Sequence, residues 1–300
     1  MHADDRVVLV LGAGGMLGNA VFRLFVDDPS YSAFGTLRSA SKTHYFTPEQ
    51  RDRLIQDVDV VSDAALAAVF AKVAPSVVIN CVGIIKQHDA AKDPLTALAV
   101  NAMLPHRLAR YCTAAGARLI HMSTDCVFSG RAGMYSENDF PDANDLYGRT
   151  KYLGEASYPN AVTLRTSIIG HELGSRYSLI DWFLGETGSV KGYSRAIFSG
   201  LPTIEVARVI RDFVIENRNL LGVYHLSATP ISKNDLLALV NEIYEKRIAI
   251  IPDEVVQIDR SLDSIRFRNA TGYVPPAWPD LIREMHRDYL KHVRSAEAEA

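Results

Sequence analysis

Short apolar runs rich in Val and Ile alternate with stretches of helical periodicity over the first 170 residues. This alternation is typical of a parallel sheet that helices cover on both faces. It predicts strands at residues 7–11, 33–37, 77–82, 118–122 and 162–166. It predicts helices at residues 16–26, 64–73, 94–115 and 146–158. The expected fold class is therefore α/β, with a Rossmann-type doubly wound parallel sheet.

Beyond residue 170 the pattern changes, because stretches rich in Gly, Ser and Tyr interrupt it, and helices recur near residues 204–217 and 233–246. We therefore expect a Rossmann domain at residues 1–170 and a smaller α/β lobe at residues 171–300. Some strands of this lobe are expected to return to the Rossmann sheet. No low-complexity linker separates the two parts, which predicts a broad interface between them.

Charge and composition exclude several classes of protein. The 32 Lys and Arg residues against 35 Asp and Glu give no electrostatic basis for binding nucleic acid or a membrane surface. The apolar run at residues 7–11 is too short for a signal peptide or a membrane span. Cys81, Cys112 and Cys126 lack C-x-x-C spacing, and the histidines lack metal-ligand spacing. We expect a cytoplasmic protein with reduced thiols and no metal.

A glycine array lies between the first predicted strand and the first predicted helix. Gly12 permits a tight turn, Gly15 lets the backbone approach a pyrophosphate, and Gly18 lets the helix pack closely on the strand. The helix N-terminus then faces the phosphates. In this strand-loop-helix context the array predicts a dinucleotide site. The residues expected to contact the cofactor here are Gly12, Gly15, Met16, Leu17 and Gly18.

The end of the second predicted strand indicates which dinucleotide is bound. An acidic residue there would bind a free ribose hydroxyl, whereas this chain has Arg38 and Ser39, with Lys42 shortly after. A guanidinium and a hydroxyl suit a 2′-phosphate, so we expect NADPH rather than NADH. The alternative is that Arg38 is an ordinary solvated surface residue.

Two further segments are expected at the cofactor. Asp59 and Val60 are placed at the end of a third strand, where the carboxylate could accept a hydrogen bond from the adenine amino group; Asp57 is an equally good candidate by pattern. Cys81, Val82 and Gly83 close the next strand and are expected to approach the cofactor. The carboxyl ends of parallel strands meet at one edge, so all these segments converge there.

Tyr147 and Lys151 are four residues apart on a predicted helix and share one of its faces. A tyrosine is a poor proton donor and acceptor at neutral pH unless a neighbouring ammonium stabilises its phenolate, and Lys151 is placed to do so. The predicted strand at residues 118–122 ends in small hydroxyl residues that could hydrogen-bond a substrate carbonyl. We favour Thr124 for this role, with Ser123 as the alternative.

With these motifs the chain resembles the extended short-chain dehydrogenases/reductases, and among them the dTDP-4-dehydrorhamnose reductase family. The resemblance rests on the glycine array, on residues 75–80, 123–130 and 164–167, and on the Tyr147-Gly-Arg-Thr-Lys151 helix. It implies that Thr124, Tyr147 and Lys151 are catalytic. The reaction it implies is transfer of a hydride from NADPH to a keto carbon of a nucleotide-activated deoxy sugar, for a cell-surface polysaccharide or related glycan. In many related reductases the helices at residues 94–115 and 146–158 form a dimer surface, which implies a homodimer.

The chain departs from the family where the sugar pocket opens. Cys126 replaces the family's tyrosine, and residues 82–88 replace an alanine- and tyrosine-containing run, so a UDP-linked N-acetylated keto sugar is an alternative substrate. Lys86 is our candidate for a new polar contact. The other candidates for substrate contacts are Ser123, Asp125, Cys126, Trp182, Lys191, Tyr193, Arg260 and Arg266, with Arg195 and Arg268 nearby.

Two other functions are weighed against this one. The first is an NAD-dependent epimerase or dehydratase of the same superfamily, but Cys126 follows Asp125 where dehydratases place a glutamate. The second is a non-catalytic NADP-binding regulatory subunit, such as the methionine adenosyltransferase regulatory subunit that resembles this family. A pure binding module has no need for Thr124, Tyr147 and Lys151 together. Glu155, one turn after Lys151, is expected to pair with a cation on the surface.

Overall fold

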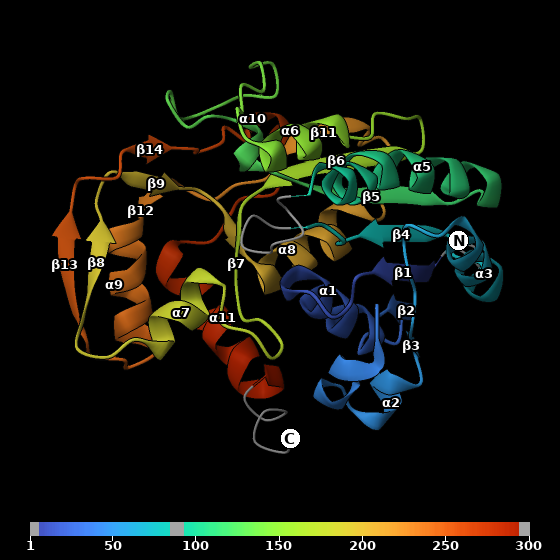
Figure 1. Cartoon of the computed structure of the whole chain (residues 1–300), viewed down its shortest axis with the longest axis horizontal. Coiled ribbons are helices and arrows are strands. Elements are labelled where there is room, and N and C mark those ends of the chain that lie inside the picture. The colour runs from blue at the N-terminus through green and yellow to red at the C-terminus, as the bar shows by residue number, and fades with distance from the viewer. Residues whose placement is uncertain (1–5, 85–92, 294–300) are drawn as a thin grey trace.

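A seven-stranded parallel sheet forms the centre of the computed structural model, which describes residues 6–84 and 93–293 (Figure 1). Its strand order is β11-β6-β5-β4-β1-β2-β3. These strands are β1 (Val7–Leu11), β2 (Ser32–Thr36), β3 (Leu54–Ile55), β4 (Val77–Asn80), β5 (Arg118–Thr124), β6 (Ala161–Thr166) and β11 (Gly222–His225). The order reverses between β1 and β4, and a sheet of this kind binds its ligands at that point.

Helices cover both faces of the sheet, and alternate side chains of β1 show this. Val8 and Val10 pack in one core with α1 (Met16–Val26) and α8 (Thr203–Val209). Leu9 and Leu11 pack in a second core with α3 (Asp63–Val73) and α5 (Leu104–Ala115). The helices and helical turns of the first half are α1 (Met16–Val26), η2 (Ala40–Tyr45), α2 (Pro48–Arg51), α3 (Asp63–Val73), α4 (Pro94–Ala97), η4 (Leu98–Met103), α5 (Leu104–Ala115), η5 (Asp125–Val127) and α6 (Leu146–Leu153).

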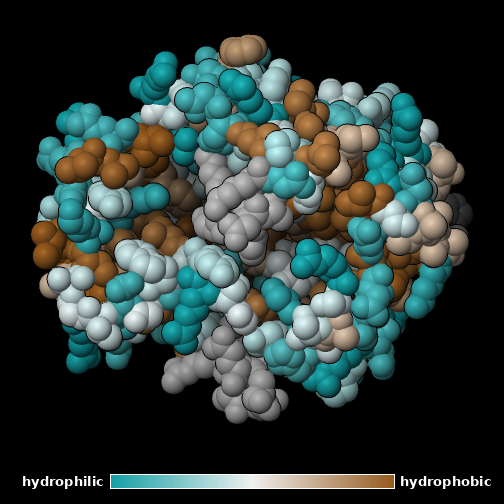
Figure 2. Space-filling model, viewed as in Figure 1, coloured by the Kyte–Doolittle hydropathy of each residue, from teal (hydrophilic) through white to brown (hydrophobic). Residues whose placement is uncertain are grey.

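The second half adds helices and three small sheets. The helices are α7 (Leu179–Gly185), α8 (Thr203–Val209), η6 (Ile210–Val214), α9 (Lys233–Ile243), α10 (Ile265–Thr271), α11 (Trp278–Asp288) and η7 (Tyr289–Val293). The small sheets pair β7 (Ile168–Ile169) with β10 (Leu201–Pro202), β8 (Ser189–Tyr193) with β13 (Ala249–Asp253), and β9 (Ala196–Phe198) with both β12 (Ile231–Ser232) and β14 (Ile258–Asp259). On the face shown in Figure 2, hydrophobic residues form several separate patches among hydrophilic ones, on both the left and the right of the view.

The doubly wound parallel sheet predicted from the sequence is confirmed, and β11 is a strand of the second half that joins it beside β6. The helix expected at residues 94–115 is present, with the π-helical turn η4 in its middle. Several expected boundaries differ from the structure, and two of them lie near the site. The third strand ends at Ile55 rather than Val60, since the chain then turns through a positive φ at Asp57. Helix α6 ends at Leu153 rather than Tyr158, because Glu155 turns into the core.

Two segments far apart in the sequence hold one another beside the carboxyl edge of the sheet. The Tyr135 N–H donates to the Ser261 carbonyl at 2.9 Å, and the Asp263 N–H donates to the Tyr135 carbonyl at 2.7 Å. The Asp259 N–H also donates to the Gly130 carbonyl at 2.8 Å. These bonds fix the backbone on either side of residue 260 against the segment that follows β5.

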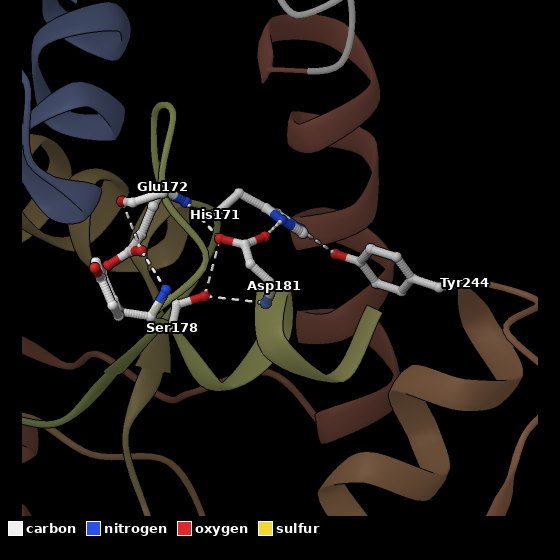
Figure 3. A network of polar contacts seen from close by, with 7 residues as sticks. His171, Glu172, Ser178, Asp181 and Tyr244 are labelled. Atoms are coloured by element: carbon white, nitrogen blue, oxygen red, sulfur yellow. Dashed lines mark hydrogen bonds and ion pairs between the residues drawn. The ribbon is translucent and has the colours of Figure 1, made fainter. Parts of the chain in front are cut away.

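A polar cluster ties the segment after β7 to α7 and α9 (Figure 3). The two ring nitrogens of His171 contact Asp181 Oδ1 at 2.5 Å and the Tyr244 hydroxyl at 2.9 Å. Asp181 Oδ2 accepts hydrogen bonds from the Glu172 N–H and the Ser178 hydroxyl. His171 is thus a structural residue whose two nitrogens both have partners, as expected for a histidine near a strand.

No helix among residues 6–84 and 93–293 combines the length and the apolar character needed to cross a membrane. The two helices expected to form a dimer surface carry exposed apolar side chains. These are Leu95, Met103 and Leu153, on α4, η4 and α6. The homodimer stays a prediction.

The close packing of α1 on β1 predicts a stability difference between two neighbouring glycines. A Cβ on Gly18 would lie 2.0 Å from the Gly12 carbonyl oxygen, whereas a Cβ on Gly15 would lie 3.4 Å from it. We expect Gly18→Ala to lower the free energy of unfolding by about 2 kcal/mol or more through overpacking. Its matched control, Gly15→Ala, should cost less than about 1 kcal/mol, since Gly15 is only a helix N-cap. Urea unfolding followed by circular dichroism measures both; equal stabilities would contradict this packing.

Candidate active site

The loop between β1 and α1 leaves space and N–H groups for an anion. Gly12 has a φ of +83°, and a Cβ there would lie 3.0 Å from the Val82 side chain. Helix α1 begins at Met16 and Leu17 without a side-chain cap and without an acidic residue in its first turn. The first N–H groups of such a helix lack helical partners and bind phosphate oxygens well. The loop therefore fits a pyrophosphate.

Cations gather at the end of β2. Arg38 and Ser39 are exposed there, and the Ser39 hydroxyl lies 2.9 Å from that of Ser41. The Lys42 ammonium donates to the Gly14 carbonyl at 2.8 Å, so η2 brings this side chain back over the glycine loop. Burial lowers the pKa of Lys42, and the Arg38 charge adds to this, while Glu172 opposes it. Sequence reasoning noted Lys42 but gave it no role, because the turn that folds it back is not visible in the spacing.

The backbone after β4 runs from the glycine loop toward α6. The Cys81 N–H donates to the Leu11 carbonyl, and burial raises the pKa of the Cys81 thiol to about 12. The Val82 N–H donates to Asn80 Oδ1. A Cβ on Gly83 would lie 3.8 Å from the Lys151 ammonium. These residues therefore join the cofactor loop to the side chains of α6.

Asp57 and Asp59 follow β3 in a loop and not at a strand end. Asp59 Oδ1 accepts a hydrogen bond from the Val61 N–H at 2.9 Å, which shapes the turn before α3. Asp57 has a φ of 57°. The adenine contact expected of Asp59 and Val60 stays a prediction.

Helix α6 carries Tyr147 and Lys151 to the carboxyl end of β5. The Lys151 ammonium donates to the Met122 carbonyl at 2.7 Å. Burial lowers the pKa of Lys151 to about 8, while the charges of Glu155 and Cys81 oppose this. Burial raises the pKa of Tyr147, and so does the nearby Cys126 thiol. The Lys151 ammonium is bound to a carbonyl and desolvated, and its expected stabilisation of the Tyr147 phenolate stays a prediction.

Thr124 and Asp125 lie next to Tyr147. The Thr124 hydroxyl donates to Asp125 Oδ1 at 3.1 Å and accepts from the Cys126 N–H at 3.1 Å. A hydrogen bond from Thr124 also opposes the rise in the Tyr147 pKa. Burial raises the pKa of Asp125, and the Arg260 charge opposes this. The structure thus brings Asp125, Cys126 and Arg260 together with two of the three predicted catalytic residues.

Ser123 points into a different network, built around Glu155. The Ser123 hydroxyl donates to Glu155 Oε1 at 2.8 Å. Arg165 Nε and Nη2 donate to the two Glu155 oxygens, both at 2.6 Å. The side chains of this pair are only 4% and 5% exposed. The expectation that Glu155 pairs on the surface is therefore wrong, because its cation comes from the neighbouring strand β6 and not from its own helix.

His225 extends this network. Its Nδ1 donates to the Tyr135 carbonyl at 2.9 Å, so its Nε2 is the acceptor for Arg165 Nη1 at 3.2 Å. Burial and the Arg165 charge lower the pKa of His225 to about 4, which keeps the imidazole neutral. The network therefore reaches from α6 through β6 and β11 to the segment after β5.

The remaining predicted substrate residues lie elsewhere. Lys191 pairs with Asp253 at 2.9 Å on the β8–β13 sheet, which also carries Tyr193 and lies at the far left of Figure 1. The Arg266 guanidinium stacks 4.6 Å from the Tyr224 ring centre, and Trp182 is 39% exposed on α7. Lys86 lies outside the described residues. Among those described, no cluster of His, Cys, Asp or Glu could hold a metal ion.

The buried Glu155–Arg165 pair predicts a large, non-additive cost when it is broken. Glu155→Gln and Arg165→Met each leave one buried charge unpaired, so each should lower the free energy of unfolding by about 3 kcal/mol or more. The double variant should lose less than the sum of the two. Arg283→Ala is the control, because its pair with Asp280 is exposed and should cost less than about 1 kcal/mol. Additive losses in a double-mutant cycle would contradict the pairing.

Comparisons with known proteins agree with this architecture. A solved structure, that of the Bacillus anthracis dTDP-4-dehydrorhamnose reductase in complex with NADP, has a TM-score of 0.77 and 19% identity to this chain. The matched region covers 94% of this chain and 98% of the B. anthracis chain. The likeness shows the shared fold.

Two curated relatives carry different names. The Danio rerio methionine adenosyltransferase 2 subunit beta is 28% identical over 240 residues, which are 76% of this chain and 70% of that protein. The Streptomyces griseus dTDP-4-dehydrorhamnose reductase is 34% identical over 148 residues, which are 49% of this chain and 43% of that protein. The family model described as the RmlD substrate binding domain matches residues 6–259. The chain therefore belongs to the RmlD substrate-binding domain family, within the extended short-chain dehydrogenase/reductase superfamily that its motifs indicate.

Proposed function

We propose that this protein reduces a keto group of a nucleotide-activated deoxy sugar with NADPH, in the manner of a dTDP-4-dehydrorhamnose reductase. The observation that carries the proposal is the meeting of Tyr147, Lys151 and Thr124 beside the backbone that follows β4. The role we propose in the cell is the synthesis of a surface polysaccharide or related glycan. The nucleotide is dTDP, UDP or GDP.

The cofactor would be held by the glycine loop and by residues 81–83, and when bound it supplies the hydride. Tyr147 gives its phenol proton to the substrate oxygen, and the Thr124 hydroxyl hydrogen-bonds the same oxygen. The buried Lys151 ammonium favours the negative charge left on Tyr147. Arg260, beside Asp125, is our choice for a contact to the sugar nucleotide. Substrate contacts of Lys86, Ser123, Cys126, Trp182, Lys191, Tyr193 and Arg266 stay predictions.

A second candidate is a non-catalytic NADP-binding regulatory subunit, which the similarity to the Danio rerio protein favours. The two candidates differ in what Tyr147 does. A regulatory subunit binds the cofactor and consumes none of it.

Turnover with a panel of substrates tests the reductase directly. We expect one of the dTDP-, GDP- or UDP-linked 4-keto-6-deoxy sugars to cause loss of NADPH absorbance at 340 nm. Tyr147→Phe should lower kcat by about a hundredfold or more, since the proton donor is lost, while NADPH still binds. NADPH binding without oxidation by any sugar would favour the regulatory subunit.

The preference for NADPH is tested through the cations after β2. Arg38→Ala and Lys42→Met should each raise the Kd for NADPH about tenfold or more, because a charge-assisted bond to the 2′-phosphate is lost, and leave the Kd for NADH unchanged. Methionine keeps the Lys42 stem packed on Gly14. Lys72→Ala, on the exposed side of α3, is the control. An unchanged Kd for NADPH in Arg38→Ala, measured by fluorescence titration, would remove this assignment.

A further inference from the structure

The Thr124 hydroxyl has one proton and several neighbours that compete for it. In the structure this proton goes to Asp125 Oδ1, while the oxygen accepts the Cys126 N–H. The Tyr147 oxygen is a second acceptor for this proton. A substrate carbonyl beside Tyr147 would be one more acceptor. An ionised Asp125 therefore holds the proton that the proposed reaction needs from Thr124.

We propose that Asp125 is a positioning residue that sets the direction of the Thr124 hydroxyl, and that a proton on Asp125 turns this hydroxyl toward the substrate. The inference rests on the proposed function. A protonated Asp125 becomes a donor to Thr124 Oγ1, whose other lone pair accepts from the Cys126 N–H. Both lone pairs are then filled, so the Thr124 O–H turns away from Asp125 toward the Tyr147 oxygen and the substrate oxygen beside it.

The protonation state of Asp125 affects both Thr124 and Tyr147. The side chain is buried, and an ionised Asp125 raises the pKa of Tyr147. The carboxylate thus opposes reduction twice, because it holds the Thr124 proton and repels the negative charge that forms on Tyr147. The groups that face Asp125 are Arg260, Thr124, Cys126, Ser167 and Tyr147. Reduction should therefore slow as the pH rises through the pKa of Asp125 in the folded protein.

The pH dependence of kcat for NADPH oxidation, with a dTDP-linked 4-keto-6-deoxy sugar as the probe, tests this in three proteins. Wild type should show one fall from Asp125 and a second near pH 8 from Lys151. Asp125→Asn should lose the first fall and keep the second. Its amide N–H donates to Thr124 at every pH, since Arg260 has only donors and attracts the amide oxygen. Asp125→Ala should lose about tenfold to a hundredfold throughout.

Two results would overturn the proposal. One is an Asp125→Asn variant that keeps the first fall. The other is an Asp125→Asn variant as slow as Asp125→Ala at every pH, because a residue that merely supports the fold would not be rescued by the amide in a pH-dependent way.

A measurement without substrate separates this inference from the proposed function. The carboxyl of Asp125 can be followed by carbon-13 NMR in aspartate-labelled protein, with Asp125→Asn for assignment. Removing the Thr124 donor in Thr124→Val should raise the pKa of Asp125 by about 0.5 or more. An unchanged pKa would contradict the Thr124–Asp125 switch. If wild type reduces no sugar, the proposed reaction is wrong. The titration then decides by itself whether the Thr124 hydroxyl changes direction when Asp125 is protonated.

Discussion

The paired hydrogen bonds between Glu155 and Arg165, both 2.6 Å long, join parts of the chain that no single element connects. Glu155 follows α6, which carries the catalytic candidates, and Arg165 lies in β6. Ser123 of β5 and His225 of β11 bind the same pair from either side. A buried carboxylate and a buried guanidinium cannot move far apart, because separating them would leave two unpaired charges out of water. The pair therefore fixes α6 relative to three strands of the sheet.

The polar groups of the site accumulate at one edge because every strand of the large sheet is parallel. The segments after β1, β2, β4 and β5 all leave from this carboxyl edge. The glycine loop, Arg38, Gly83 and Thr124 were therefore predictable from sequence as neighbours in space. The hydrophobic periodicity predicted the strands, and the residue types that follow each strand predicted the cofactor and substrate contacts. Tyr147 and Lys151 were predictable as a pair because helical spacing sets their common face.

The features that escaped the sequence depend on tertiary contacts. Glu155 lies one helical turn after Lys151, which is a spacing typical of an ion pair on a surface helix. Only the position of β6 shows that Glu155 is buried with Arg165. Lys42 returns to Gly14 through a short helical turn that leaves no periodic signal. The role of Arg260 depends on backbone bonds between segments more than 100 residues apart, such as Tyr135 to Ser261. The pKa of Tyr147 depends on burial, which spacing does not give.

The position of β11 at the end of the sheet order has a consequence for synthesis on the ribosome. Residues 1–170 emerge first, and at that stage β6 is an open sheet edge with unpaired backbone groups. Arg165 then has Glu155 but not His225, which lies 60 residues later in the chain. Helix α6 is thus translated well before the contacts that hold it are complete. A nascent chain of this length exposes the unpaired edge of β6, which could pair with a strand of another chain until β11 covers it.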